Sequence, residues 1–150
     1  MSRRIWTTAR KDVVVDTDIM AAGDAIGGLI SFKVPSSGVV HVVVVTDAGD
    51  VLTMNIRAWM FETEPAGVAT NAPFALTDAD LERLVGISVL NTSKDAINGR
   101  LLFEPSADTT SGIPYVAPDG LLWLQLEQDG AGTPTFNATD DVKVKLFIEY

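Results

Sequence analysis

Two long apolar runs joined by a short polar turn, between Gly38 and Phe61, constrain the fold more than any other part of the chain. The first run, Val39 to Val45, is rich in valine, whose restricted side-chain rotamers favour a pleated strand over a helix. The second run, Leu52 to Phe61, alternates between two faces, as a half-buried strand does. Asp47 to Asp50 supplies a glycine for a tight turn. We therefore predict a central hairpin with an interior first strand and a half-exposed second strand.

Further short β-type runs flank this segment, and they are separated by turn residues without any strand–helix–strand spacing. Asn98 and Gly99 are typical of a two-residue hairpin loop. The pattern predicts an all-β protein, an antiparallel β-sandwich of the jelly-roll kind. The expected additional strands are Ile5–Ala9, Val13–Val15, Leu29–Val34, Ile87–Leu90, Arg100–Phe103, Leu121–Glu127 and Val142–Glu149.

One short helix is expected from Leu76 to Gly86, as a cap over a sheet. Thr77 is a good N-cap residue, and Asp80 three residues later completes a capping box. Gly86 offers a stop at the C-terminal end. The side chains expected on the buried side of this helix are Leu81, Leu84 and Val85.

The charge of the chain is unevenly distributed. The net charge is −9, all 20 acidic residues lie from Asp12 onward, and four of the 11 basic residues precede it. We expect a basic N-terminal arm at residues 1–12 and a single β-sandwich domain at residues 13–150, since 150 residues suffice for one core. The arm is either a frayed terminus or a segment that docks on an acidic neighbour. Its basic residues are Arg3, Arg4, Arg10 and Lys11.

Composition also excludes several classes of function. An acidic chain lacks the basic face that nucleic acid requires, and its longest apolar run is too short to span a membrane. The absence of cysteine removes thiolate nucleophiles and cysteine-bound zinc. His41, the single histidine, is expected to be a hydrogen-bonded residue of the core or its rim, because no nucleophile is predicted near it. We therefore expect no enzymatic activity, no cofactor and no metal site.

Large aromatic residues recur among polar ones along three of the predicted strands. Counting the alternation places Arg57, Trp59, Trp123 and Phe147 on faces that point away from the core. Aromatic and arginine residues are the usual anchors of protein interfaces. We predict that these four residues, together with the basic residues of the arm, form a contact with another subunit or with a partner protein. The alternative is that a β-bulge returns an aromatic side chain to the core.

Three segments resemble small virion proteins of tailed bacteriophages: AAGDAIGG at Ala21–Gly28, the polar turn at Asp47, and NAPFALTDADLERLVG at Asn71–Gly86. Where the family pattern has Asp-Asn, this chain has Thr70-Asn71, so no role of that acid is carried over. The resemblance implies a jelly-roll capsid decoration, or cement, protein made in the host cytoplasm and located on the capsid surface. It also implies the major capsid protein as partner and a homo-oligomer, with a trimer favoured.

Two other functions remain open from the sequence. The chain could be a receptor- or glycan-binding module of a phage tail or head fibre, using the long loops Glu62–Ala75 and Asp129–Asp141. A small hydrolase is a more distant alternative, because paired carboxylates such as Asp140 and Asp141 occur without a recognisable catalytic spacing.

Overall fold

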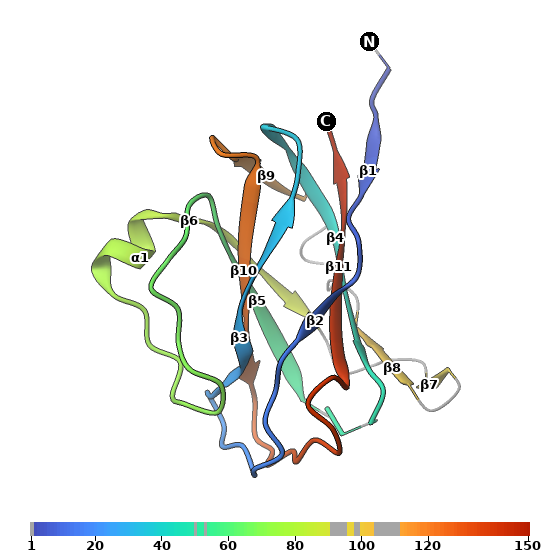
Figure 1. The fold of residues 1–150 in the computed structure, drawn as a ribbon, viewed down its shortest axis with the longest axis vertical. Helices are drawn as coiled ribbons and strands as arrows, with labels where there is room; N and C mark the ends of the chain where they lie inside the picture. Colours follow the sequence, from blue (N-terminus) through green and yellow to red (C-terminus); the bar gives the residue numbers. More distant parts are fainter. Residues whose placement is uncertain (1, 50, 53, 91–95, 98–99, 104–111) are drawn as a thin grey trace.

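The computed structural model describes residues 2–49, 51–52, 54–90, 96–97, 100–103 and 112–150. Two antiparallel sheets pack face to face, and one short helix lies at the side of the sandwich (Figure 1). The seven-stranded sheet contains β1 (Ile5–Thr7), β2 (Lys11–Val13), β4 (Ser37–Asp47), β7 (Ala96–Ile97), β8 (Arg100–Phe103), β9 (Ile113–Val116) and β11 (Val142–Glu149). The four-stranded sheet contains β3 (Ala25–Lys33), β5 (Asn55–Phe61), β6 (Leu84–Leu90) and β10 (Leu121–Asp129). The predicted all-β sandwich with one short helix is confirmed.

The order of the strands matches that of a jelly roll. The seven-stranded sheet runs β1-β11-β4-β8-β7, with β2 also paired to β11 and β9 also paired to β4. The four-stranded sheet runs β3-β10-β5-β6. The last two long strands, β10 and β11, are therefore each inserted between earlier strands of different sheets, as the two Greek keys of a jelly roll require.

The predicted central hairpin is wrong, because β4 and β5 lie in different sheets. β4 pairs with β11, β8 and β9, whereas β5 pairs with β10 and β6. The backbone N–H groups of Gly49, Val51 and Leu52 donate to the Asp47 carboxylate at 3.0, 2.8 and 2.8 Å. Leu52 and Met54 are buried in the core. The connection therefore crosses between the two sheets instead of folding back along one of them.

β4 is also buried on one face only. Val40, Val43 and Val45 belong to the core, whereas Val42 and Val44 are half-exposed on the opposite face. A strand in the middle of a two-layer sandwich has one face against the other sheet and one face outward. The run of valines therefore indicates a high β propensity, and it does not indicate that both faces of the strand are buried.

The core between the sheets follows the alternation along β5 and β11. Ile56, Ala58 and Met60 point inward from β5, as predicted. β11 has the predicted bounds, Val142–Glu149, and its inward side chains are buried in the same cluster. Those side chains are Val142, Val144, Leu146 and Ile148. The pairing of β7 with β8 agrees with a hairpin there, although its loop residues, Asn98 and Gly99, lie outside the described residues.

The helix α1 (Asp78–Glu82) is shorter than predicted. The capping box is present as predicted: Thr77 Oγ1 accepts from the Asp80 backbone N–H at 3.1 Å, and Asp80 Oδ2 accepts from the Thr77 backbone N–H at 3.3 Å. The helix ends at Arg83, and the chain continues directly into β6, so Gly86 is a strand residue. Leu81 is 47% exposed, which corrects its predicted burial. The buried residue of the helix is Asp80.

We predict that Asp47→Ala lowers the free energy of unfolding by about 2–4 kcal/mol, because the N–H groups of the crossing segment lose their acceptor. Burial raises the pKa of the Asp47 carboxyl, while the hydrogen bonds from Leu52, Val51 and Gly49 act in the opposite direction. Urea unfolding followed by circular dichroism measures the change. Thr46→Ala, at the neighbouring half-exposed position, is the control, and an equal loss in both variants would contradict the assignment.

A second prediction concerns acid stability. The N–H of Ala66, followed by the Thr77 side chain, lowers the pKa of Asp80. A lowered folded-state pKa gives a contribution that is present above the pKa of the unfolded carboxyl, about 3.9, and is lost as pH falls through the lower folded value. The difference in melting temperature between the wild type and Asp80→Asn should therefore shrink below about pH 4. Asp78→Asn, in the same turn, is the control; a difference that stays constant with pH would refute the prediction.

Candidate interaction surface

The side chains predicted to form one interface lie on opposite outer faces of the sandwich. Arg57 and Trp59 on β5, together with Trp123 on β10, belong to the outer face of the four-stranded sheet. Phe147 on β11 belongs to the outer face of the seven-stranded sheet. The structure therefore does not bring the four residues together, and each outer face has to be considered by itself.

On the four-stranded sheet, Trp59 and Arg57 are engaged within the chain. The Trp59 ring stacks on Phe74, with ring centroids 5.3 Å apart and planes inclined by 29°. Its indole N–H donates to Glu127 Oε2 at 2.7 Å. Arg57 forms an ion pair with Asp129 at 2.9 Å and approaches Glu127 at 3.7 Å. The Trp59 indole N–H and the Arg57 guanidinium are therefore bonded within the chain, whereas a residue that anchors an interface would offer such groups to a partner protein.

The segment 62–77, here named the covering loop, packs over this outer face (Figure 1). The side chain of Gln125 is buried, accepts from the N–H of Val68 at 3.0 Å and donates to the carbonyl oxygen of Gly27 at 3.2 Å. A further hydrogen bond holds the covering loop: the Asp80 carboxylate accepts from the backbone N–H of Ala66 at 2.8 Å. Phe61, which lies opposite Trp123 on the same outer face, is fully buried.

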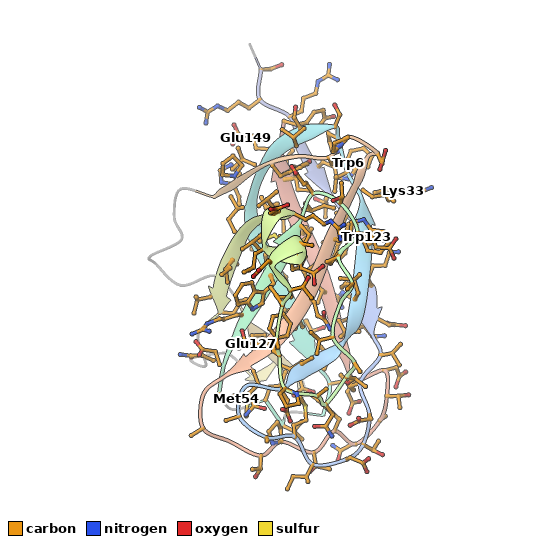
Figure 2. All side chains as sticks on the ribbon, turned by 90° about the vertical axis from the view of Figure 1, so that its left-hand side faces the viewer. Trp6, Lys33, Met54, Trp123, Glu127 and Glu149 are labelled. Atoms are coloured by element: carbon orange, nitrogen blue, oxygen red, sulfur yellow. The ribbon has the colours of Figure 1, made fainter. Side chains whose placement is uncertain are left out.

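Trp123 is half-buried on the same outer face. In the sheet it lies opposite Ser31 on one side and Phe61 on the other. Figure 2 shows its side chain in the upper half of the molecule, on the same side as Lys33. With the buried Phe61 beside it, Trp123 leaves only part of its side chain accessible.

The outer face of the seven-stranded sheet is different. Phe147 lies opposite Val42 of β4 and Thr7 of β1, and Lys145 lies opposite Val44. In the part of the chain that the structure describes, no loop is hydrogen-bonded across these positions. We name this surface the open face, and its members are Ile5, Val42, Val44, Lys143, Lys145 and Phe147.

The open face combines apolar and basic groups. The Lys145 ammonium lies 4.8 Å from the centroid of the Phe147 ring, a cation–π contact. Lys143 forms an ion pair with Asp12 at 2.6 Å. A shallow depression of about 340 Å³ runs between Ile5, Phe147 and Val42. The face can therefore take an apolar side chain of a partner while its lysines meet negative charge.

The basic N-terminal residues border this face. β1 and β2 both pair with β11, so residues 5–7 and 11–13 are edge strands of the sheet. Arg3 forms an ion pair with Glu149 at 2.9 Å, and Arg4 exchanges two backbone hydrogen bonds with Tyr150 at 3.1 and 3.0 Å. Lys11 lies opposite Val144, a core residue of β11, so its side chain is on the inner side of the sheet and not on the open face; Arg10 immediately precedes it. Both side chains are exposed.

His41 occupies a bulge of β4 at the rim of the open face. The pairing with β11 shifts between Phe147 and Ile148, and this leaves His41 as the unpaired residue of β4. Its side chain is exposed, and Nε2 lies 2.8 Å from Glu149 Oε2. The expected hydrogen-bonded rim residue agrees with this position, whereas the interior strand position is wrong, because alternation alone cannot locate a bulge.

The described residues include no group of three or more His, Cys, Asp or Glu side chains that could hold a metal ion. Within the same residues, no helix is long and apolar enough to cross a membrane. Comparison of the chain with models of known protein families and with curated protein sequences finds no match.

We predict that Trp59→Ala lowers the free energy of unfolding by about 2–4 kcal/mol, because it removes the ring beneath Phe74 and leaves Glu127 without its indole donor. Trp59→Phe, which keeps an aromatic ring, should lose about 1 kcal/mol. Denaturant unfolding of the purified protein measures both values. If Trp59→Ala unfolds at the wild-type denaturant concentration, the ring has no structural role and an interface role regains support.

Proposed function

We propose that this chain is a structural subunit of a tailed-bacteriophage virion, a capsid decoration or cement protein that binds the major capsid protein through the open face. The observation that carries the proposal is the contrast between the two outer faces. One is covered by residues 62–77, and the other presents Phe147, Val42 and Val44, over which no segment of the described part of the chain is hydrogen-bonded. Apolar residues gathered on an uncovered face are typical of a protein contact surface.

The charges of the face support a partner with an acidic surface. The chain as a whole carries a net charge of −9, yet Lys145 lies on the open face with its ammonium near the Phe147 ring, whereas Lys143 and Arg3 are balanced by Asp12 and Glu149. Opposite charges across an interface accelerate association and fix the orientation of the partners, and salt weakens them. Docking of this face on the shell would place the acidic remainder of the molecule outward.

The resemblance of Ala21–Gly28 and Asn71–Gly86 to small phage virion proteins supplies the capsid as the specific partner, and with it a homo-oligomer, with a trimer favoured. A jelly roll suits such a mechanical role, because it has a continuous core and two rigid sheet faces. The protein would be made in the host cytoplasm and would act on the capsid surface. A receptor- or glycan-binding fibre module is favoured less, since the loop at Glu62–Ala75 is held on the sheet by Gln125.

The proposal predicts that Lys145→Glu combined with Phe147→Ser weakens binding to purified phage heads that lack the protein by at least about tenfold, or about 1.4 kcal/mol. Both side chains are half-exposed, so the variant should stay folded, which circular dichroism checks. Co-sedimentation with the heads at several salt concentrations measures the affinity. Lys33→Glu, an equal charge reversal on β3, is the control. Undiminished co-sedimentation of the double variant would refute the open face as the docking surface.

A further inference from the structure

A groove separate from the open face lies where β1 passes the end of β3. Its volume is about 680 Å³, within the range of small-molecule sites. The residues that carry the argument are Trp6, Lys33, Pro35, Asp119, Leu121 and Tyr150. Figure 1 shows both chain ends at this end of the sandwich, and Figure 2 shows Trp6 and Lys33 close to the same end.

Two aromatic side chains form part of the groove and are unusually accessible. Trp6 is 43% exposed and Tyr150 is 44% exposed. Their ring centroids lie 6.5 Å apart with the planes inclined by 81°, so the rings make two walls nearly at right angles. Trp59, by contrast, is stacked on Phe74 and donates to Glu127. Within the described residues, no protein acceptor binds the indole N–H of Trp6.

The backbone at both walls is fixed by strand pairing, and the two rings contact each other edge to face. Trp6 lies opposite Ile148 in the pairing of β1 with β11, and Tyr150 is fixed by its two backbone hydrogen bonds to Arg4. The side of the groove opposite the two rings is a tight turn, in which Gly120 has a φ of +68°. The carbonyl oxygen of Gly120 accepts from the Val34 N–H at 3.0 Å. A preformed groove of this kind loses little conformational entropy on binding.

The polar groups at the groove have opposite charges. Lys33, the last residue of β3, contributes an ammonium with three donors, and Asp119 contributes a carboxylate that only accepts. An ionic ligand would meet one of these groups with like charge. A purely apolar ligand would leave both without a partner, which costs free energy on desolvation. The lining thus favours a neutral ligand with both apolar surface and hydroxyl groups.

A pyranose sugar has this combination of groups. The C–H bonds on one face of its ring are apolar and can stack on an aromatic side chain, while the hydroxyl groups around the ring both donate and accept. We propose that the groove between Trp6, Lys33 and Asp119 is a binding site for a neutral oligosaccharide. The site is independent of the proposed capsid contact, because Phe147 and Lys145 lie on the outer face of the sheet and do not line it.

Isothermal titration calorimetry of the full chain with maltohexaose, cellohexaose and chitohexaose tests the proposal. At least one of these neutral hexasaccharides should bind with a Kd of about 1 mM or tighter. Trp6→Ala should weaken that binding at least tenfold, and Asp119→Asn should weaken it less. Both positions are exposed, so the variants should keep the circular dichroism spectrum of the wild type.

Trp123→Ala is the matched control, since it removes a tryptophan that does not line the groove and should leave sugar binding unchanged. The double variant Lys145→Glu with Phe147→Ser should also bind the sugar normally, which separates this site from the capsid contact. Failure of all three hexasaccharides to bind, or equal binding by Trp6→Ala and the wild type, would overturn the proposal.

Discussion

The chain changes sheets between β4 and β5, and this crossing depends on one buried carboxylate. Asp47 ends β4 inside the sandwich, where its oxygens accept from three backbone N–H groups of the segment that follows. A crossing segment has no neighbouring strand to satisfy its backbone, so an internal acceptor must replace the missing ladder. Leu52 then enters the core, and β5 begins on the opposite sheet. This connection is one of several that carry the chain from one sheet to the other, since β3 and β4, and β10 and β11, also lie in different sheets.

Among the described residues, the two outer faces differ because a buried polar side chain holds a loop on one of them. Gln125 points outward from the middle of β10, and its amide pairs with the backbone of Val68 and Gly27. Because both the oxygen and the NH2 group of this buried amide are hydrogen-bonded, the amide fixes the loop on the sheet and leaves no polar atom of its own unpaired. The corresponding middle positions of the open face carry Val42, Val44 and Phe147, which offer no hydrogen bond to a loop backbone. Within the described residues these side chains therefore stay half-exposed.

Local patterns predicted the strands well and their partners poorly. β11 has the bounds expected from its alternation, and Thr77 caps the helix as its sequence indicates, because both signals are carried by residues close together in the chain. The hairpin prediction was wrong because apolar–polar alternation identifies a strand but does not identify the strand with which it pairs. A hairpin and a crossing between sheets can follow similar turn residues. The residue that distinguishes a crossing from a hairpin here is the apolar Leu52 close after the turn, because the loop of an ordinary hairpin is solvent-exposed.

The same limit explains which interface residues could be found from the sequence. Counting alternation correctly placed Trp59 and Phe61 on an outward face, but it could not show that a later segment, containing Phe74, would cover that face. Burial on an outer face depends on long-range packing, which leaves no periodic signal in the strand itself. Trp6 illustrates the converse, since its position in a short edge strand gives it few neighbours and leaves its ring accessible. Exposure in this fold is thus decided by what lies above each sheet and not by the strand pattern alone.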